Sequence, residues 1–405
     1  MLVTEQKKKS TESEWLAAKR LAALVAYDKE PLPDRVSHLW KYSDPTWFEF
    51  KPQNGQTISS ENIKTIFNVE QEFKTKGIFL IELSQAFCIE AYKEVISKTY
   101  GQHTSKSSSR LTYFNDALWS SGYFLYVPKE VKIKKPITIK SLINKNKSNK
   151  VEVIRNLIVL EEGADISLID EISSDEDSTT SINIVSEIFL AKGAKLNCLN
   201  LQTNNKNTTQ HFFQRANLEE HSEFISLIVG LGGKISKIDL GTSLNGYGAS
   251  STTYGIVLGD ETQKFDHHTR IEHIAPHTKS ALNFRVALKD KARSAYTGNL
   301  KIAHEAVKSD AHQENRNLLL SSEAKAESIP ELEILTNDVI RCNHGVTVSQ
   351  VDKDQIYYLT SRGLNQKDAE RIIIEGFFEP TISRIPDESL REEISSKIKA
   401  KLENL

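Results

Sequence analysis

Hydrophobic residues in the middle of the chain occur in short runs separated by polar turns. From about residue 130 onward, runs such as Ile137–Ile139 and Val151–Ile154 follow one another, and no long stretch with helical periodicity lies between them. Short apolar or alternating runs bounded by turns are typical of β-strands, in which successive side chains point to opposite faces. The central part of the chain is therefore predicted to consist of strands.

A sequence repeat accompanies these runs. A leucine is followed by two mostly polar residues, a turn position and a small residue, and this pattern begins at Leu160, Leu190, Leu218, Leu258, Leu288 and Leu320. The leucines are 30, 28, 40, 30 and 32 residues apart. Such periods indicate stacked supersecondary units. We expect a β-solenoid with leucines and small residues stacked inside; a β-sandwich with chance similarity at its turns is the alternative.

Helical patterns flank the β-rich part on both sides. They divide the chain into a mixed, partly helical N-terminal region (residues 1–125), a solenoid core (126–350) and a C-terminal helical region (351–405). The predicted fold class is therefore mainly β, with α-helical regions at both ends.

The last predicted helix carries a narrow apolar stripe. Leu390, Ile394 and Ile398 follow one another at intervals of four residues, and their neighbours are Glu and Lys. Residues four apart lie on the same face of a helix. Because a small helical unit buries little by itself, the stripe must either pack on the solenoid or offer a surface to a partner.

Composition and charge exclude several classes of protein. The formal net charge of −2 argues against a general nucleic-acid binder. No apolar run approaches the roughly 18 residues of a membrane span, and the first fifteen residues lack the apolar segment of a secretory signal. Three widely spaced cysteines, Cys88, Cys198 and Cys342, cannot form a disulfide framework. We expect a cytoplasmic protein, with a plastid or another organelle as the alternative, and neither nucleic acid nor membrane as a partner.

Motifs of nucleotide-dependent and hydrolytic enzymes are missing from the sequence. Neither G-x-x-x-x-G-K-[ST] nor G-x-G-x-x-G after a strand occurs, and Gly230–Lys234 lacks the P-loop spacing. H-E-x-x-H and G-x-S-x-G are not found either. The chain is expected not to be an enzyme. A β-helix enzyme acting on polysaccharide is the alternative, but no convincing pair of carboxylates supports it.

Histidines are unevenly distributed, which makes them candidate metal ligands. Six of the eleven fall within one segment: His267, His268, His273, His277, His304 and His312. On a solenoid, however, these positions belong to different strands and turns. Ordinary polar positions, or the lining of an interface, are therefore the alternatives to a metal site.

Cys342 and His344 form a more specific pair. In an extended strand, side chains two residues apart project from the same face. A thiolate and an imidazole side by side suit a thiophilic metal such as iron or zinc, and Gly345 would let another backbone approach closely. Zinc sites, however, need three or four protein ligands. Either the missing ligands come from elsewhere, or the pair is a buried cysteine beside a hydrogen-bonded histidine.

The pair belongs to a longer C-terminal motif. The sequence has P-x-L-E-I at Pro330–Ile334, the C-x-H segment at Cys342–Val348, and Ile356–Gly363 reading IYYLTSRG. Together with His38–Tyr42 near the N-terminus, these segments closely resemble the SufB/SufD family, the scaffold subunits of the SUF iron–sulfur cluster assembly machine. Further matches in the repeat region extend the resemblance over most of the chain: Asp266, His273, Ser280 and Gly298.

Within this family, the chain is most similar to the SufD type. SufB-like chains tend to be longer and carry Glu after the motif histidine, whereas this chain has 405 residues and Gly345. Two positions depart from the usual pattern, since Val346 stands where Ala is usual and Ser349 where SufD-like chains commonly have Gly. A SufB-type paralogue that works as a homodimer with SufC is the alternative.

The resemblance implies both a fold and a function. The family has a right-handed parallel β-helix core between helical regions, and SufB and SufD pair through their β-helices. Each C-terminal helical region binds one copy of the ABC-type ATPase SufC, which would account for the missing P-loop. The family assembles a nascent iron–sulfur cluster at the SufB–SufD junction, and SufD contributes the histidine of the C-x-H segment. This role carries over to His344, with Cys342 as an accompanying thiol and the remaining ligands in the SufB chain.

The resemblance leaves the small molecules open. The cluster is expected to be transient and shared between subunits, and its type and its recipients are not specified. Family complexes have been associated with reduced flavin, but no dinucleotide fingerprint in this sequence supports a flavin site.

Overall fold

The computed structural model describes residues 13–403, apart from 37, 51–61, 69, 107–108, 145–150 and 177. The expectation about a secretory signal applies to the first fifteen residues, of which the first twelve lie outside the described residues.

Helices lie mainly at the two ends of the described chain. They are α1 (Glu14–Lys29), η1 (His38–Trp40), η2 (Pro45–Phe48), α2 (Gln71–Thr75), α3 (Leu83–Ala86), α4 (Glu90–Thr99), α5 (Gln102–Lys106), α6 (Arg110–Leu118), α7 (Lys353–Ser361), α8 (Gln366–Ile382) and α9 (Glu388–Glu403). None of the helices in this part of the chain is long and apolar enough to cross a membrane.

Strands make up most of the chain between these helices. They are β1 (Ile63–Asn68), β2 (Phe79–Glu82), β3 (Tyr123–Val127), β4 (Ile137–Ile143), β5 (Val151–Leu160), β6 (Asp165–Ser174), β7 (Ser181–Leu190), β8 (Lys195–Gln202), β9 (Thr209–Leu218), β10 (Glu223–Gly230), β11 (Ile235–Leu244), β12 (Ser250–Gly259), β13 (Lys264–His273), β14 (Lys279–Leu288), β15 (Arg293–Ile302), β16 (Ser309–Leu319), β17 (Lys325–Ile334) and β18 (Val339–Gln350).

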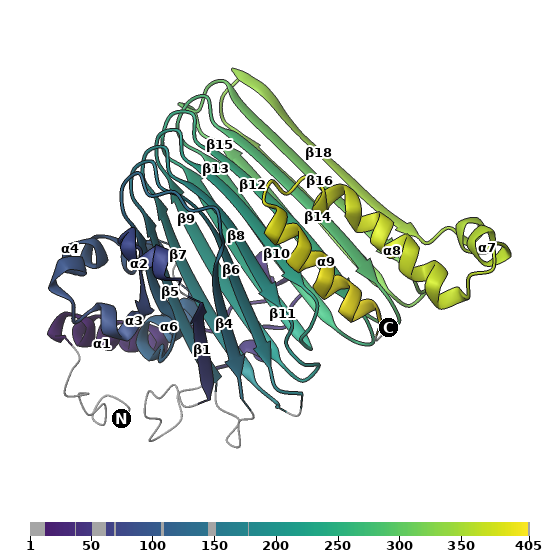
Figure 1. The fold of residues 1–405 in the computed structure, drawn as a ribbon, viewed down its shortest axis with the longest axis horizontal. Helices are drawn as coiled ribbons and strands as arrows, with labels where there is room; N and C mark the ends of the chain where they lie inside the picture. The colour runs from purple at the N-terminus through teal and green to yellow at the C-terminus, as the bar shows by residue number, and fades with distance from the viewer. Residues whose placement is uncertain are drawn as a thin grey trace.

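Two sheets form the walls of a β-solenoid (Figure 1). Even-numbered strands from β4 to β18 make up one wall, sheet A, and odd-numbered strands from β3 to β17 make up the other, sheet B. Neighbouring strands within each wall are parallel, because the chain crosses to the opposite wall before it returns. At the N-terminal end, β1 pairs antiparallel with β4 and β2 pairs antiparallel with β3. The predicted mainly β solenoid with helices at both ends is confirmed.

The leucine repeat marks two edges of the solenoid rather than one. Leu160, Leu190 and Leu218 end strands of sheet B, whereas Leu258 and Leu288 lie at the ends of strands of sheet A. The separation of 40 residues is the point at which the series passes to the opposite edge. The true period is more regular, since successive strands of sheet B from β5 to β17 begin at residues 151, 181, 209, 235, 264, 293 and 325, which are 30, 28, 26, 29, 29 and 32 apart.

The prediction that the repeat leucines stack inside the solenoid holds for part of the series, because Leu258 and Leu320 instead pack in the outer cluster under the C-terminal helices. Leu160, Leu190 and Leu218 are register partners on β5, β7 and β9, and all three are buried. Ala164 and Ala194 of the following turns lie in the same core cluster. Full burial of a leucine side chain stabilises a fold by about 1.5–3 kcal/mol, so each turn gains from stacking on the next.

A left-handed backbone position recurs in the turns of this edge. Gly163 and Gly193 have φ angles of 68° and 66°, and a Cβ at Gly163 would lie 2.4 Å from Oε1 of Glu130. His221 takes the same turn position in the next turn with φ 55°. The repeat thus keeps its turn geometry where glycine is replaced, although this conformation costs a non-glycine residue about 1–2 kcal/mol.

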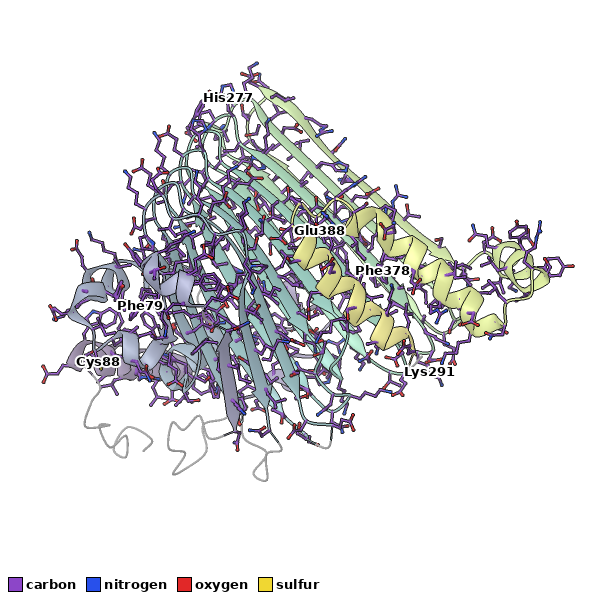
Figure 2. The ribbon with its side chains drawn as sticks, viewed as in Figure 1. Phe79, Cys88, His277, Lys291, Phe378 and Glu388 are labelled. Carbon is purple, nitrogen blue, oxygen red and sulfur yellow. The ribbon has the colours of Figure 1, made fainter. Side chains whose placement is uncertain are left out.

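The C-terminal helices cover the outer face of sheet A (Figure 1). Leu390, Ile394 and Ile398 of α9 are buried in one cluster with residues of α8, such as Phe378 (Figure 2), and with strand residues such as Leu227. Ion pairs fix the same helix to the solenoid, from Lys397 to Glu171 and from Lys401 to Asp260. The apolar stripe therefore packs on the solenoid and does not form a surface for a partner.

N-terminal helices cover part of the outer face of sheet B. Residues of α1, α3, α4 and α6 form one core cluster with side chains of β5, including Val153 and Leu157. A buried ion network crosses this contact, because the guanidinium of Arg155 lies 2.5 Å from carboxylate oxygens of both Asp116 and Glu187. Breaking a buried pair of this kind costs about 3–5 kcal/mol.

The segment around η1 lies farther along the same face and contacts β11 and β13. The ammonium of Lys237 lies 4.6 Å from the ring centroid of Trp40 and 2.8 Å from Oδ2 of Asp266, and the hydroxyl of Ser43 donates to the same carboxylate. Burial alone would raise the pKa of Asp266, but its neighbours His268 and Lys237 hold it well below its usual range. Two segments that resemble the family, far apart in sequence, therefore meet here.

Two of the clustered histidines lie inside the solenoid. His267 is buried beside Phe284, with ring centroids 6.1 Å apart, and burial lowers its pKa to about 4. His273 is buried as well, with Nδ1 2.8 Å from the hydroxyl of Thr278 and Nε2 2.8 Å from that of Ser280, and burial lowers its pKa to about 4. Both rings are therefore neutral members of the core at pH 7.

The packing of α9 on sheet A predicts that shortening one of its buried side chains lowers the stability of the fold. Ile394→Ala should lower the free energy of unfolding by about 2–5 kcal/mol, because it leaves a cavity between helix and sheet. Chemical denaturation of the full chain measures this change. The matched control is Ser396→Ala at an exposed position of the same helix, where the expected change is within about 0.5 kcal/mol. Equal effects of the two substitutions would contradict the packing described.

The buried histidines predict that acid destabilises the fold. His267 keeps its proton off down to about pH 4 in the folded chain, whereas the unfolded ring takes one up below about pH 6.5. The titration of this histidine therefore leaves the free energy of unfolding unaffected above pH 6.5. As the pH falls from 6.5 toward 4, that free energy decreases by about 1.4 kcal/mol per pH unit. His267→Phe should make unfolding free energies measured between these values depend less steeply on pH. His304→Phe, at an exposed turn, should keep the wild-type slope; an equal change in both would refute the assignment.

Candidate functional site

At the C-terminal end of the solenoid, no described segment forms a further turn on the last one. β17 is the last strand of sheet B and β18 the last of sheet A, so within the described residues each is paired along one edge only. Many of their side chains are exposed or half-buried, unlike those of the inner turns. The unpaired edges present backbone N–H and C=O groups that can bind another strand.

Strand register places Cys342 and His344 on the inner face of this last turn. Cys342 pairs with Ala311 of β16, and His344 pairs with Gln313. Both residues of β16 are fully buried inside the solenoid, and side chains at paired positions of neighbouring strands lie on the same face. Cys342 and His344 therefore lie side by side above the core, at the open end.

The environments of the two side chains differ. Cys342 is half-buried against the solenoid core, and burial raises the pKa of its thiol. His344 is exposed. Since a thiol binds metal as the thiolate, the imidazole is the more accessible ligand, and Cys342 needs a metal or a positive neighbour to lose its proton. A Cβ at Gly345 would meet nothing within 4 Å, so no contact within the described chain requires glycine there.

Exposed apolar side chains surround the pair. Val346 and Val348 follow on the same face of β18, and they are 39% and 45% exposed because no described residue covers them. Leu335 and Ile340, in and beside the turn between β17 and β18, are exposed as well. Exposed apolar side chains that are grouped on one turn of a fold are candidate contact sites for other proteins.

The six clustered histidines do not form one site. His267 and His273 lie inside the solenoid, and His268 lies on the outer face of sheet B against the ion pair of Asp266. The others occupy outer positions: His277 in a turn at the edge (Figure 2), His304 in the next turn of that edge, and His312 on the outer face of sheet A, where its Nδ1 lies 2.6 Å from Oδ1 of Asn343. Among the described residues, no group of three or more His, Cys, Asp or Glu could hold a metal ion.

Two features of this end of the molecule become apparent only in the structure: the burial of Gln313 beside His344, and the exposed position of α7, whose sequence is part of the C-terminal motif. Gln313 is fully buried next to His344 across the ladder; glutamine is not a usual metal ligand, so only strand register reveals it. The second feature is α7, which has no buried residue and projects away from the solenoid (Figure 1). Its Tyr357 and Tyr358 are 75% and 57% exposed.

Comparison with known proteins identifies the family of this chain. Residues 142–377 match the family model described as "SUF system FeS cluster assembly, SufBD core domain", and residues 62–139 match the model of the SufBD protein N-terminal region. Proteins named as iron–sulfur cluster assembly SufBD family proteins from Staphylococcus epidermidis, Staphylococcus saprophyticus and Staphylococcus aureus are each 26% identical over 420 aligned positions, which cover 96% of this chain and 89% of theirs. The chain belongs to the SufBD family of SUF-system iron–sulfur cluster assembly proteins.

Proposed function

We propose that this chain is a non-catalytic, SufD-like scaffold subunit that supports the assembly and transfer of nascent iron–sulfur clusters at its interface with a SufB-like subunit. The observation that carries the proposal is the open end of the solenoid, where Cys342 and His344 lie on one face above the core. The cluster is cargo. Two ligands cannot complete it, so the remaining ligands belong to the partner.

The open end favours a partner with the same architecture. The unpaired edges of β17 and β18 can continue into the strands of a second solenoid by strand addition. Such a partner would cover Val346 and Val348 and remove their side chains from water. A SufB-like subunit is the occupant that we propose, because it would supply cysteine ligands. A homodimer of this chain is the second candidate, since its two-fold symmetry would satisfy both edges equally.

In this proposal, His344 binds the cluster before Cys342 does. Its imidazole is exposed at the end of the solenoid, whereas Cys342 is half-buried and its raised pKa keeps the thiol protonated. A rearrangement of the interface, driven by ATP binding to a SufC-like subunit, would expose the thiol and allow it to join. His344 is therefore assigned to cluster binding and Cys342 to an accompanying role.

Helix α7 is the part of the C-terminal region that we assign to the SufC-like ATPase. The stripe on α9 cannot serve, because it is buried against sheet A. Tyr357 and Tyr358 instead present two aromatic rings on a projecting helix, and exposed aromatic side chains commonly dominate the binding energy of interfaces. ATP hydrolysis would thus be the task of a partner in the cytoplasm, and this chain is not an enzyme in the proposal.

The assignment of α7 predicts a selective loss of one partner. Tagged full-length chain recovered from native extract should bring down a SufC-like ATPase and a SufB-like chain. Tyr357→Ser combined with Tyr358→Ser should reduce recovery of the ATPase by about 10-fold or more, as expected for lost aromatic anchors, and leave the SufB-like chain bound. Tyr247→Ser, which removes an exposed aromatic from the turn between β11 and β12, is the control. Recovery of the ATPase alone with wild type would favour the homodimer.

The assignment of His344 predicts a loss of cluster without a loss of structure. In the complex of this chain with SufB-like and SufC-like subunits, supplied with ferrous iron and sulfide, His344→Ala should lower the yield of bound cluster by about 10-fold or more. Its unfolding midpoint and its partners should remain those of wild type, because the side chain is exposed. His312→Ala, on the opposite face of the neighbouring strand, is the control. An unchanged cluster yield in His344→Ala would disprove the site.

A further inference from the structure

Gln313 is a buried polar side chain without a partner at the open end. It lies on the inner face of β16, directly next to His344 in the ladder, and is fully buried. Neither its amide nitrogen nor its amide oxygen has a hydrogen-bond partner within the described part of the chain. An unsatisfied buried polar group costs about 1–3 kcal/mol, so a hydrophobic residue would serve the core better.

The opposite wall of the solenoid makes room for this side chain. A Cβ at Gly298 of β15 would lie 2.2 Å from Nε2 of Gln313 and 2.8 Å from the hydroxyl of Tyr296. With Gln313 in this conformation there is no space for a side chain at residue 298, so glycine there lets Gln313 reach across the interior. Tyr296 is itself fixed, since its hydroxyl lies 3.0 Å from that of Thr269. The amide of Gln313 thus lies against the opposite wall, while its nitrogen and oxygen form no hydrogen bond with the described residues.

Two glutamines in the inner turns of the solenoid, unlike Gln313, have hydrogen-bond partners for their amide oxygens. The amide oxygen of Gln214 accepts from Asn200 at 3.3 Å, and that of Gln210 accepts from Asn204 at 2.7 Å. Both side chains are buried on the inner face of β9. Buried glutamines can therefore find at least one partner within the solenoid; among the described residues, Gln313 has both amide atoms unpaired, and it lies next to the candidate ligand.

We propose that Gln313 is a positioning residue of the cluster assembly site, whose amide oxygen accepts a hydrogen bond from the ring N–H of His344. The inference rests on the proposed function, since it assigns His344 as a ligand. Neighbouring strands lie about 4.8 Å apart, so a turn of the exposed imidazole toward the core brings one ring nitrogen to the amide. The other nitrogen then points out of the open end toward iron. Histidine ligands typically donate their second N–H in this way, which fixes ring orientation and tautomer.

Gln313 would act on His344 only when a partner subunit covers the open end of the solenoid. In the isolated chain His344 faces water and has little reason to turn inward. When a second subunit closes the end, the imidazole loses its water, and the unpaired amide of Gln313 becomes the acceptor that its N–H requires. Gln313 would thus select one orientation of the ring at the moment the interface forms, while its own desolvation penalty is relieved.

The test compares Gln313→Leu with a matched luminal variant in the complex of the full chain with its SufB-like and SufC-like partners. Loaded with ferrous iron and sulfide, Gln313→Leu should hold about 10-fold less cluster, and the visible absorption spectrum of the remaining cluster should change. Its unfolding midpoint should be equal to or above that of wild type, since it removes an unsatisfied group. Gln214→Leu should do the opposite: a lower midpoint from the lost contact with Asn200, with cluster yield and spectrum retained.

The results of these variants show whether the positioning role of Gln313 fails alone or together with the proposed function. If His344→Ala lowers the cluster yield but Gln313→Leu leaves yield and spectrum unchanged, the positioning role is overturned and the scaffold function stands. If Gln214→Leu lowers the yield as much as Gln313→Leu, the effect belongs to the core in general, and the positioning role is again overturned. If His344→Ala itself leaves the yield unchanged, the proposed site fails, and the role of Gln313 fails with it.

Discussion

Parallel stacking of strands in register is the constraint on which this structure depends. Each inner strand is hydrogen-bonded along both edges; β10, for instance, pairs residue by residue with β8 and with β12. This arrangement satisfies the backbone of every turn except the first and the last. At the N-terminal end the antiparallel strands β1 and β2 complete the two sheets. At the other end β17 and β18 keep an unpaired edge in the part of the chain that the structure describes.

The helical regions complete the solenoid on its sides and leave this end open. Strands of sheet A carry apolar residues on their outer as well as their inner face, among them Leu227 and Ile256, and α8 and α9 cover them. The N-terminal helices and the segment around η1 do the same for sheet B, with buried charges of Arg155 and Asp266 at the contacts. Because helices and the segment around η1 cover both walls, the end of the solenoid keeps exposed apolar side chains such as Val346 and Val348.

Three groups at the open end of the solenoid are left incomplete. The thiol of Cys342 is half-buried with a raised pKa, His344 is uncovered, and the amide of Gln313 has no partner among the described residues. Such departures from good packing and full hydrogen bonding are expected at functional sites. The exposure of Cys342 and His344 has one physical origin, because a turn without a successor among the described residues leaves its own inner face uncovered.

Short-range pattern was enough to predict the solenoid, its flanking helices, and the placement of Cys342 and His344 on one face, because strand alternation and a repeat near 30 residues are local properties of the sequence. Other features depend on which strands stack on which. The tertiary structure alone shows that the series changes edge before Leu258, that Ile394 packs inside the molecule, and that Gln313 lies beside His344. These contacts join residues about 30 or more positions apart, and parallel register, which no local pattern encodes, brings them together.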